Sequence, residues 1–288
     1  MEPRQCSLHV NDIDLVWFEW AGANGNDDAP LVFAHATGFH ARVWDAVIEH
    51  FAGRRVISID LRGHGRSGGG PITHWQSVSD DVNALIDHLG LENAMGIGHS
   101  MGAHVLLQCA ADRTGAFANL VLFDPVILAP EFYAPASPLF TADNPHPASR
   151  RKADFSSPEA MMERFRTRDP FNLFAPRVLE DYCRYGLLPS ATGEGFELAC
   201  APQMEASVYA SSRSNSGILE TAKAVDTPTL IIRAQQSDVQ DFKGSPTWPP
   251  LAETMPAGTD LDRSDHTHFH PFEDPADAAA IIERAISG

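Results

Sequence analysis

The chain has 288 residues, of which 43% are hydrophobic and 20% charged, and its formal net charge is −17. This length suits one large α/β domain or a domain with an insertion, and the composition is typical of a globular protein. The acidic balance argues against a nucleic-acid-binding protein, which needs a basic face, and against anionic membrane surfaces as partners.

Short apolar segments alternate with helical patterns along the chain. Partial alternation over residues 13–20 predicts an early antiparallel strand with one exposed face. Near-continuous apolar runs, typical of parallel strands covered on both faces, lie at residues 31–34, 56–59, 120–123 and 229–232. Helical periodicity is found near residues 43–51, 78–89, 101–111 and 276–286. This order predicts an α/β fold with a mostly parallel, doubly wound sheet.

Residues 125–225 interrupt this alternation because they contain no strong strand signal. The segment is rich in proline at first, has helical patterns near 158–168 and 176–185, and holds all four tyrosines. Such a length exceeds a plain crossover and predicts a helical cap inserted after the strand at 120–123, with residues 1–124 and 226–288 as the core. Its aromatic residues either form a satellite core or line an apolar pocket, and the sequence leaves both interpretations open.

Residues 98–102, Gly-His-Ser-Met-Gly, fit the pattern G-x-S-x-G between a short apolar strand and a helix. In that setting a serine is exposed on a sharp turn as a nucleophile. A Cβ atom at either flanking glycine would crowd the neighbouring strand and helix. We therefore predict that Ser100 is a nucleophile rather than a structural turn residue.

A serine hydroxyl needs a base within hydrogen-bond reach, and imidazole suits this task because its ordinary pKa lies near neutrality. Three candidates alternate near the C-terminus: His266, His268 and His270. In an extended segment they would share one side, as metal ligands do. No further ligand spacing is evident, and the serine explains a histidine better, so we predict no metal site.

From the strand before His35 to the last helix, the chain resembles an α/β-hydrolase. In this family the base commonly stands in a segment G-H-F-P-x-x-E-x-P, five residues before the glutamate. Glu273 is followed by Asp274-Pro275 here. The resemblance therefore assigns the base to His268, with His266 as the alternative.

The acid that orients the base has two main candidates, and Asp241 is a weaker third. The family usually carries it after the strand that follows the cap, and there Asp238 fits the pattern, with Ala234 in place of a common glycine. The order Ser100, Asp238, His268 also agrees with this fold. Asp124, directly after the strand at 120–123, is the alternative because some family members place the acid there. The resemblance favours Asp238.

The resemblance also implies an oxyanion hole and a pocket. One donor is the backbone N–H of Met101, at the start of a helix, and the other is that of Thr37. Thr37 lies in residues 35–39, which resemble the family's H-G-x-G motif with Ala36 replacing a glycine. The residues expected to line the substrate pocket are His35, Gly38, Phe39, His99 and Phe132.

Together these features imply a serine hydrolase that cleaves carboxylic esters or lactones through an acyl-enzyme, without a cofactor. Residues 60–67 are glycine-rich but lack phosphate-loop spacing, and no G-x-G-x-x-G motif follows the first strand. Three alternatives remain open: a carbon–carbon bond hydrolase of the meta-cleavage type, a cofactor-free haloperoxidase-like enzyme, and a ligand receptor with little turnover.

Cellular location and partners follow from weaker signals. Residues 1–6 are polar and lack the apolar region of a signal peptide, and no apolar run approaches transmembrane length. The four cysteines show no C-x-x-C pattern. We expect a cytoplasmic protein that acts on a small apolar ester or lactone and binds neither nucleic acid nor membrane. The sequence leaves open whether it forms a homodimer.

Overall fold

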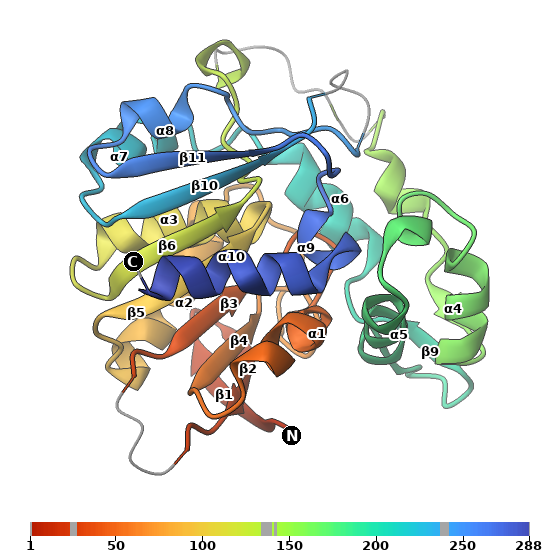
Figure 1. Ribbon diagram of the computed structural model, residues 1–288. Helices are drawn as coiled ribbons and strands as arrows, with labels where there is room; N and C mark the ends of the chain where they lie inside the picture. The colour runs from red at the N-terminus through yellow and green to blue at the C-terminus, as the bar shows by residue number, and fades with distance from the viewer. Residues whose placement is uncertain (1, 24–27, 134–139, 141–142, 237–241, 288) are drawn as a thin grey trace.

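A computed structural model describes all residues except 1, 24–27, 134–139, 141–142, 237–241 and 288. Its centre is an eight-stranded sheet with the order β1-β2-β4-β3-β5-β6-β10-β11 (Figure 1). The strands are β1 (Arg4–Val10), β2 (Ile13–Trp20), β3 (Leu31–Ala34), β4 (Val56–Asp60), β5 (Ala94–His99), β6 (Phe117–Phe123), β10 (Thr229–Ala234) and β11 (Gly258–Arg263). Only β2 runs against its neighbours β1 and β4, and the other pairs are parallel. The predicted α/β fold with a mostly parallel sheet is confirmed.

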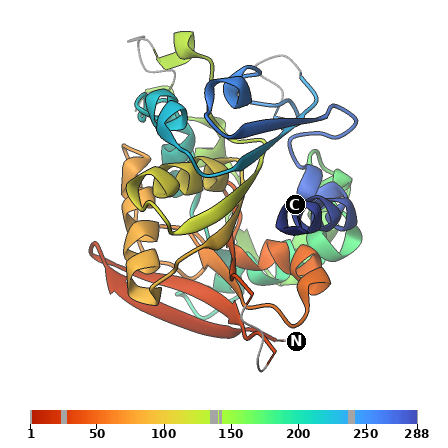
Figure 2. The same cartoon turned by 60° about the vertical axis from the view of Figure 1, so that its left-hand side comes forward.

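Helices cover both faces of this sheet (Figures 1 and 2). One face carries α2 (Gln76–Leu89), α3 (Met101–Asp112), α7 (Ile218–Ala224) and α8 (Leu251–Thr254). The other face carries η1 (Ala41–Trp44), α1 (Asp45–Ile48), η2 (Glu49–Phe51), α9 (His270–Glu273) and α10 (Pro275–Ser287). Strand β4 is therefore buried on both faces. Ile57 and Ile59 belong to the buried cluster with α2 and α3, and Val56 belongs to the buried cluster with α1 and α10.

The exposed face predicted for residues 13–20 is wrong in part. Asp14 is exposed, but Val16 and Phe18 are buried against Ala41 of η1. The guanidinium of Arg42 lies 5.4 Å from the centre of the Phe18 ring. The short helix η1 therefore covers a face of β2 that the sequence pattern leaves open.

Apart from α7, which packs on the sheet, the chain between β6 and β10 consists of short elements, many of which lie at the right of Figure 1. These elements are η3 (Pro130–Tyr133), η4 (Pro147–Arg150), β7 (Asp154–Phe155), α4 (Pro158–Phe165), η5 (Phe171–Leu173), α5 (Pro176–Tyr185), β8 (Leu187–Pro189), β9 (Phe196–Leu198) and α6 (Pro202–Ala210). Helices α4 and α5 correspond to the predicted helical patterns. The three-stranded antiparallel sheet β7-β9-β8 has strands too short to give a periodic signal.

Aromatic side chains join this segment to the main domain. Phe39, which follows β3, lies with ring centres 6.0 Å from Phe174 and 5.1 Å from Tyr182 of the segment. It also stacks on Phe272 of α9 at 5.2 Å. These rings belong to the same buried cluster as α1 and α10, so the segment shares the hydrophobic core of one face.

Among the described residues, no helix is both long and apolar enough to cross a lipid bilayer.

Candidate active site

Ser100 occupies the sharp turn between β5 and α3. Its backbone has φ 56° and ψ −115°, in the left-handed region that non-glycine residues rarely adopt. The Ser100 N–H donates to the carbonyl of Phe123 at 3.0 Å, and the Ser100 carbonyl accepts from the N–H of Val126 at 3.2 Å. The strained turn is thus held by hydrogen bonds to the end of the adjacent strand β6 and the residues after it.

Both glycines of the motif are required by close backbone approach. A Cβ atom on Gly98 would lie 2.5 Å from the Cα atom of Ala103, and one on Gly102 would lie 2.3 Å from the carbonyl oxygen of Ala34. Real Cβ contacts are essentially never shorter than 3.0 Å. The glycines therefore allow α3 to leave the turn close to β5 and β3, as the motif predicts.

The structure joins Ser100, His268 and Asp124 in one chain of hydrogen bonds. The Nε2 atom of His268 lies 3.0 Å from the Oγ atom of Ser100, and its Nδ1 atom lies 2.5 Å from Oδ2 of Asp124. Ser100 follows β5, Asp124 follows β6 and His268 lies in the loop after β11. All three are thus at the carboxyl ends of parallel strands, where open α/β sheets bind their ligands.

The acid in this arrangement is the alternative candidate. Asp124 is buried, and its Oδ1 atom accepts hydrogen bonds from the hydroxyl of Thr247 at 3.1 Å, the N–H of Ala234 at 3.3 Å and the hydroxyl of Ser245. These donors hold the carboxylate with Oδ2 directed at the base. Asp238, the acid favoured from the sequence, lies outside the described residues.

The residues predicted to form the oxyanion hole are neighbours. Met101 opens α3, so its N–H belongs to the helix N-terminus, where backbone donors lack partners within the helix. The hydroxyl of Thr37 lies 3.7 Å from the Sδ atom of Met101. Gly38, with φ 79°, provides the left-handed residue of the turn that carries Thr37.

His35 was expected in the pocket wall, but its side chain is fully buried. Its Nδ1–H donates to the carbonyl of Ala36 at 2.8 Å, and its Nε2 atom accepts from the N–H of Leu61 at 3.0 Å. Burial holds the pKa of His35 well below its usual range, so the ring is neutral. His35 therefore joins the turn after β3 to the end of β4 rather than lining the pocket.

His99 was also expected in the pocket wall and is instead fully buried behind the base. Its Nε2 atom lies 2.7 Å from the carbonyl oxygen of His268, so this nitrogen carries the proton and donates. Burial, together with the nearby imidazole of His268, holds the pKa of His99 well below its usual range. The neutral ring fixes the backbone of the residue that contacts Ser100.

We predict that His99→Phe lowers kcat for ester hydrolysis by about ten- to a hundredfold, since small displacements of a catalytic group have effects of this size. The phenyl ring fills the same volume but cannot donate to the His268 carbonyl. KM should change little, because His99 does not reach the cavity wall, and His99→Gln should recover part of the lost rate through its amide donor. A kcat for His99→Phe equal to that of the unmodified chain would exclude this positioning role.

A cavity of about 460 Å³ lies between the turn after β3 and the segment between β6 and β10. Its aromatic and turn residues are Thr37, Gly38, Phe39, His146, Phe165, Phe171, Tyr182, Tyr209, Phe242 and Phe269. Gly38 and Phe39 thus lie on the wall as expected. Phe132 is not among the described wall residues, since it lies in η3 with the guanidinium of Arg213 5.3 Å from its ring centre.

The charged residues of this wall were missed in the sequence. Five cations contribute to it: Arg150, Arg151, Lys152, Arg164 and Arg168. The available signal was two short basic runs, at 150–152 and 164–168, in a chain with 38 acidic and only 21 basic residues. The two runs come together only when the segment folds, and their spacing in the sequence does not predict that they do.

Comparison with known proteins gives the family. Residues 31–281 match the alpha/beta hydrolase family. The chain belongs to this family. It is 26% identical over 225 residues to the AB hydrolase superfamily protein YisY of Bacillus subtilis, covering 74% of this chain and 76% of that protein. It is 31% identical over 103 residues to the sn-1-specific diacylglycerol lipase ABHD11 of Danio rerio, covering 34% of this chain but only 32% of the lipase.

Solved structures confirm that this hydrolase has the family fold along its whole length. E-2-(acetamidomethylene)succinate hydrolase superimposes with a TM-score of 0.77 over 99% of this chain and 100% of its own. The two sequences are 18% identical, so the likeness concerns the fold alone.

The three alternating histidines of this family member do not meet at one point, because the His266 and His270 rings lie with centres 4.3 Å apart while His268 points elsewhere. His268 faces Ser100, whereas His266 lies 3.2 Å from a carboxylate oxygen of Asp265 and His270 lies 2.7 Å from one of Asp277. Within the described part of the chain, no group of three or more His, Cys, Asp or Glu side chains is arranged to hold a metal ion.

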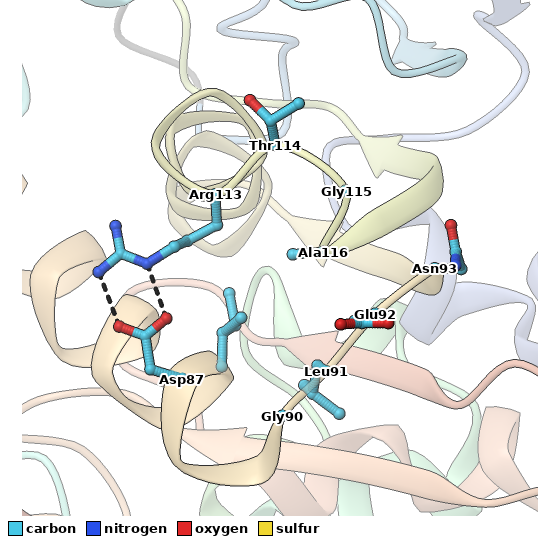
Figure 3. A pocket seen from close by; sticks show the side chains of 10 residues that line it. Asp87, Gly90, Leu91, Glu92, Asn93, Arg113, Thr114, Gly115 and Ala116 are labelled. Atoms are coloured by element: carbon cyan, nitrogen blue, oxygen red, sulfur yellow. Dashed lines mark hydrogen bonds and ion pairs between the residues drawn. The ribbon is translucent and has the colours of Figure 1, made fainter.

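Another hollow, of about 490 Å³, lies before the first residues of β5 and β6 (Figure 3). It is lined by polar loop residues and by an ion pair between Arg113 and Asp87 at 2.8 Å. Ser100 follows the carboxyl end of β5, whereas this hollow lies at the amino ends of the strands. Its described lining offers no nucleophile with an adjacent base.

Proposed function

We propose that this protein is a serine hydrolase that cleaves carboxylic esters or lactones through an acyl-enzyme. The observation that carries the proposal is the hydrogen-bonded chain of Ser100, His268 and Asp124. The Ser100 hydroxyl attacks the carbonyl carbon while His268 takes its proton, and Asp124 keeps the imidazole in the required tautomer. His268 then donates the proton to the leaving group.

Charge that develops on the carbonyl oxygen is stabilised by the N–H groups of Thr37 and Met101, each worth about 3 kcal/mol of the barrier. Water, activated by His268, then attacks the acyl carbon and releases Ser100. The proposed cycle uses only side chains and backbone groups of this chain, with no metal or organic cofactor.

We further propose that residues 125–225, apart from α7, which packs on the sheet, act as a cap on the core formed by residues 1–124 and 226–288. In support, the cavity is bounded on one side by Gly38 and Phe39 of the core and on the other by Phe165, Phe171 and Tyr182 of the segment. A cap of this kind excludes water and positions the substrate.

An alkyl 4-nitrophenyl phosphonate tests the proposal, because an activated serine displaces nitrophenolate and keeps the phosphonyl group. We expect one equivalent of nitrophenolate per chain and a label on the peptide that contains Ser100. A substrate panel should then show steady turnover of 4-nitrophenyl esters or lactones. Absence of a label, or a label on another residue, would refute the proposal. Turnover confined to a diketone would support carbon–carbon bond cleavage instead.

A further inference from the structure

The cavity of about 460 Å³ that is bounded by Thr37, Gly38 and Phe39 has a wall whose charge is opposite to that of the protein. Arg150 ends η4, Arg151 and Lys152 follow it, Arg164 lies in α4 and Arg168 follows α4. Against these five cations, the described lining contains two carboxylates, Asp169 and Glu205. The whole chain carries a net charge of −17, so this concentration of cations runs against its composition.

The two carboxylates do not neutralise the wall. Glu205 is paired with Arg151 at 2.5 Å, and Asp169 is paired with Lys243 at 3.4 Å. The other four cations have no carboxylate within ion-pair distance among the residues that the structure describes: Arg150, Lys152, Arg164 and Arg168. By contrast, Arg166, which lies between two of them in sequence but outside the wall, is paired with Glu163 at 2.8 Å.

This charged wall is connected to the turn that carries Thr37. The Arg151 guanidinium donates to the Tyr182 hydroxyl at 3.1 Å, and that hydroxyl donates to the carbonyl of Gly38 at 3.4 Å. Burial raises the pKa of Tyr182 to about 12, so the hydroxyl keeps its proton. The cavity wall thus includes Thr37, one of the two residues predicted to form the oxyanion hole, together with the unpaired cations.

We propose that the substrate carries a free carboxylate, which the unpaired cations bind while its ester or lactone carbonyl lies at Ser100. This inference rests on the proposed function and specifies its substrate class. Guanidinium groups bind carboxylates through two parallel hydrogen bonds, and a cavity lined by one sign of charge raises the local concentration of the opposite ion. The aromatic side chains of the same wall cover the apolar part of such a substrate.

Two esters that differ only in charge test this inference: mono-4-nitrophenyl adipate and its neutral methyl ester. We expect kcat/KM to be at least about tenfold higher for the carboxylate, the value of a charge-assisted hydrogen bond. Since Lys152 and Arg168 are exposed, this preference should fall as ionic strength rises. Spontaneous hydrolysis is subtracted with Ser100→Ala as the blank.

The double variant Arg164→Gln, Arg168→Gln should lose most of the preference. The ratio of the two kcat/KM values is insensitive to a loss of folded protein, because both esters use the same catalytic groups. Arg166→Gln is the matched control: it removes one positive charge from the same stretch, but from outside the wall, and should keep the ratio of the unmodified chain.

The outcomes separate the two proposals. Equal kcat/KM values for the two esters, with turnover that depends on Ser100, would overturn the inference and leave the proposed function intact. A preference that survives in the double variant, or that Arg166→Gln abolishes to the same extent, would also overturn the inference. Failure to cleave either ester would overturn the inference, and it would also overturn the proposed function if the phosphonate left Ser100 unlabelled.

Discussion

Replacing Ser100 by alanine should lower kcat for 4-nitrophenyl ester hydrolysis by about a millionfold, as expected when the nucleophile of a cooperative triad is removed. The remaining groups bind substrate and polarise its carbonyl, but no acyl-enzyme forms. Alanine keeps a Cβ atom and the backbone of the turn, so the fold should survive. Initial rates at saturating substrate, with nitrophenolate absorbance as the readout, measure the effect.

Ser79→Ala is the matched control for this experiment. Ser79 lies in α2, is fully buried, and its hydroxyl has no hydrogen-bond partner among the described residues. Its replacement should leave kcat unchanged. If Ser100→Ala retained more than a trace of activity while remaining inhibited by the phosphonate, another residue would be the nucleophile.

Asp124→Asn should lower kcat by about ten-thousandfold, the loss seen when an amide replaces the acid of such a triad. The amide no longer accepts from His268 as a carboxylate does, so the ring loses the tautomer that places its free nitrogen toward Ser100. The buried side chain keeps nearly the same shape, and circular dichroism should show an intact fold. The rate of a single turnover, followed by nitrophenolate release, measures the loss directly.

Asp238→Asn is the paired variant, because the family resemblance favours that residue as the acid. We expect it to retain the kcat of the unmodified chain, since the base already has its carboxylate partner in Asp124. The opposite pattern, with Asp238→Asn inactive and Asp124→Asn active, would return the role to Asp238.

The interior of the sheet was predictable from sequence because its strands are buried on both faces and therefore form continuous apolar runs. The edges were not. Strand β1 (Arg4–Val10) is largely exposed, and β11 (Gly258–Arg263) carries Asp260 and Asp262, so neither shows an apolar run. Charged side chains on edge strands prevent pairing with other chains, which removes the signal by which strands are found.

Ser100 and His268, the proposed nucleophile and base, each lie in a local motif that the sequence shows, whereas the proposed acid depends on contacts between distant segments. Strands β6 and β10 are adjacent and parallel, so the residues that follow each of them lie together at the carboxyl ends of the strands. Asp124 and Asp238 were therefore both compatible with the sequence. The structure places Asp124 2.5 Å from His268, a contact that no spacing rule contains, and Asp238 lies outside the described residues.

The hydrogen bonds of the Ser100 turn affect which parts of the site separate first when the protein unfolds locally. The Ser100 N–H is hydrogen-bonded to the carbonyl of Phe123, the residue next to Asp124, so the proposed nucleophile and acid are held at the ends of two adjoining interior strands. His268, by contrast, follows β11, which is the last strand of the sheet and pairs on one side only. Strands at the edge of a sheet unfold locally more readily than strands in its interior. We therefore expect local opening of β11 to move His268 away from Ser100 while the interior strands that carry Ser100 and Asp124 remain paired.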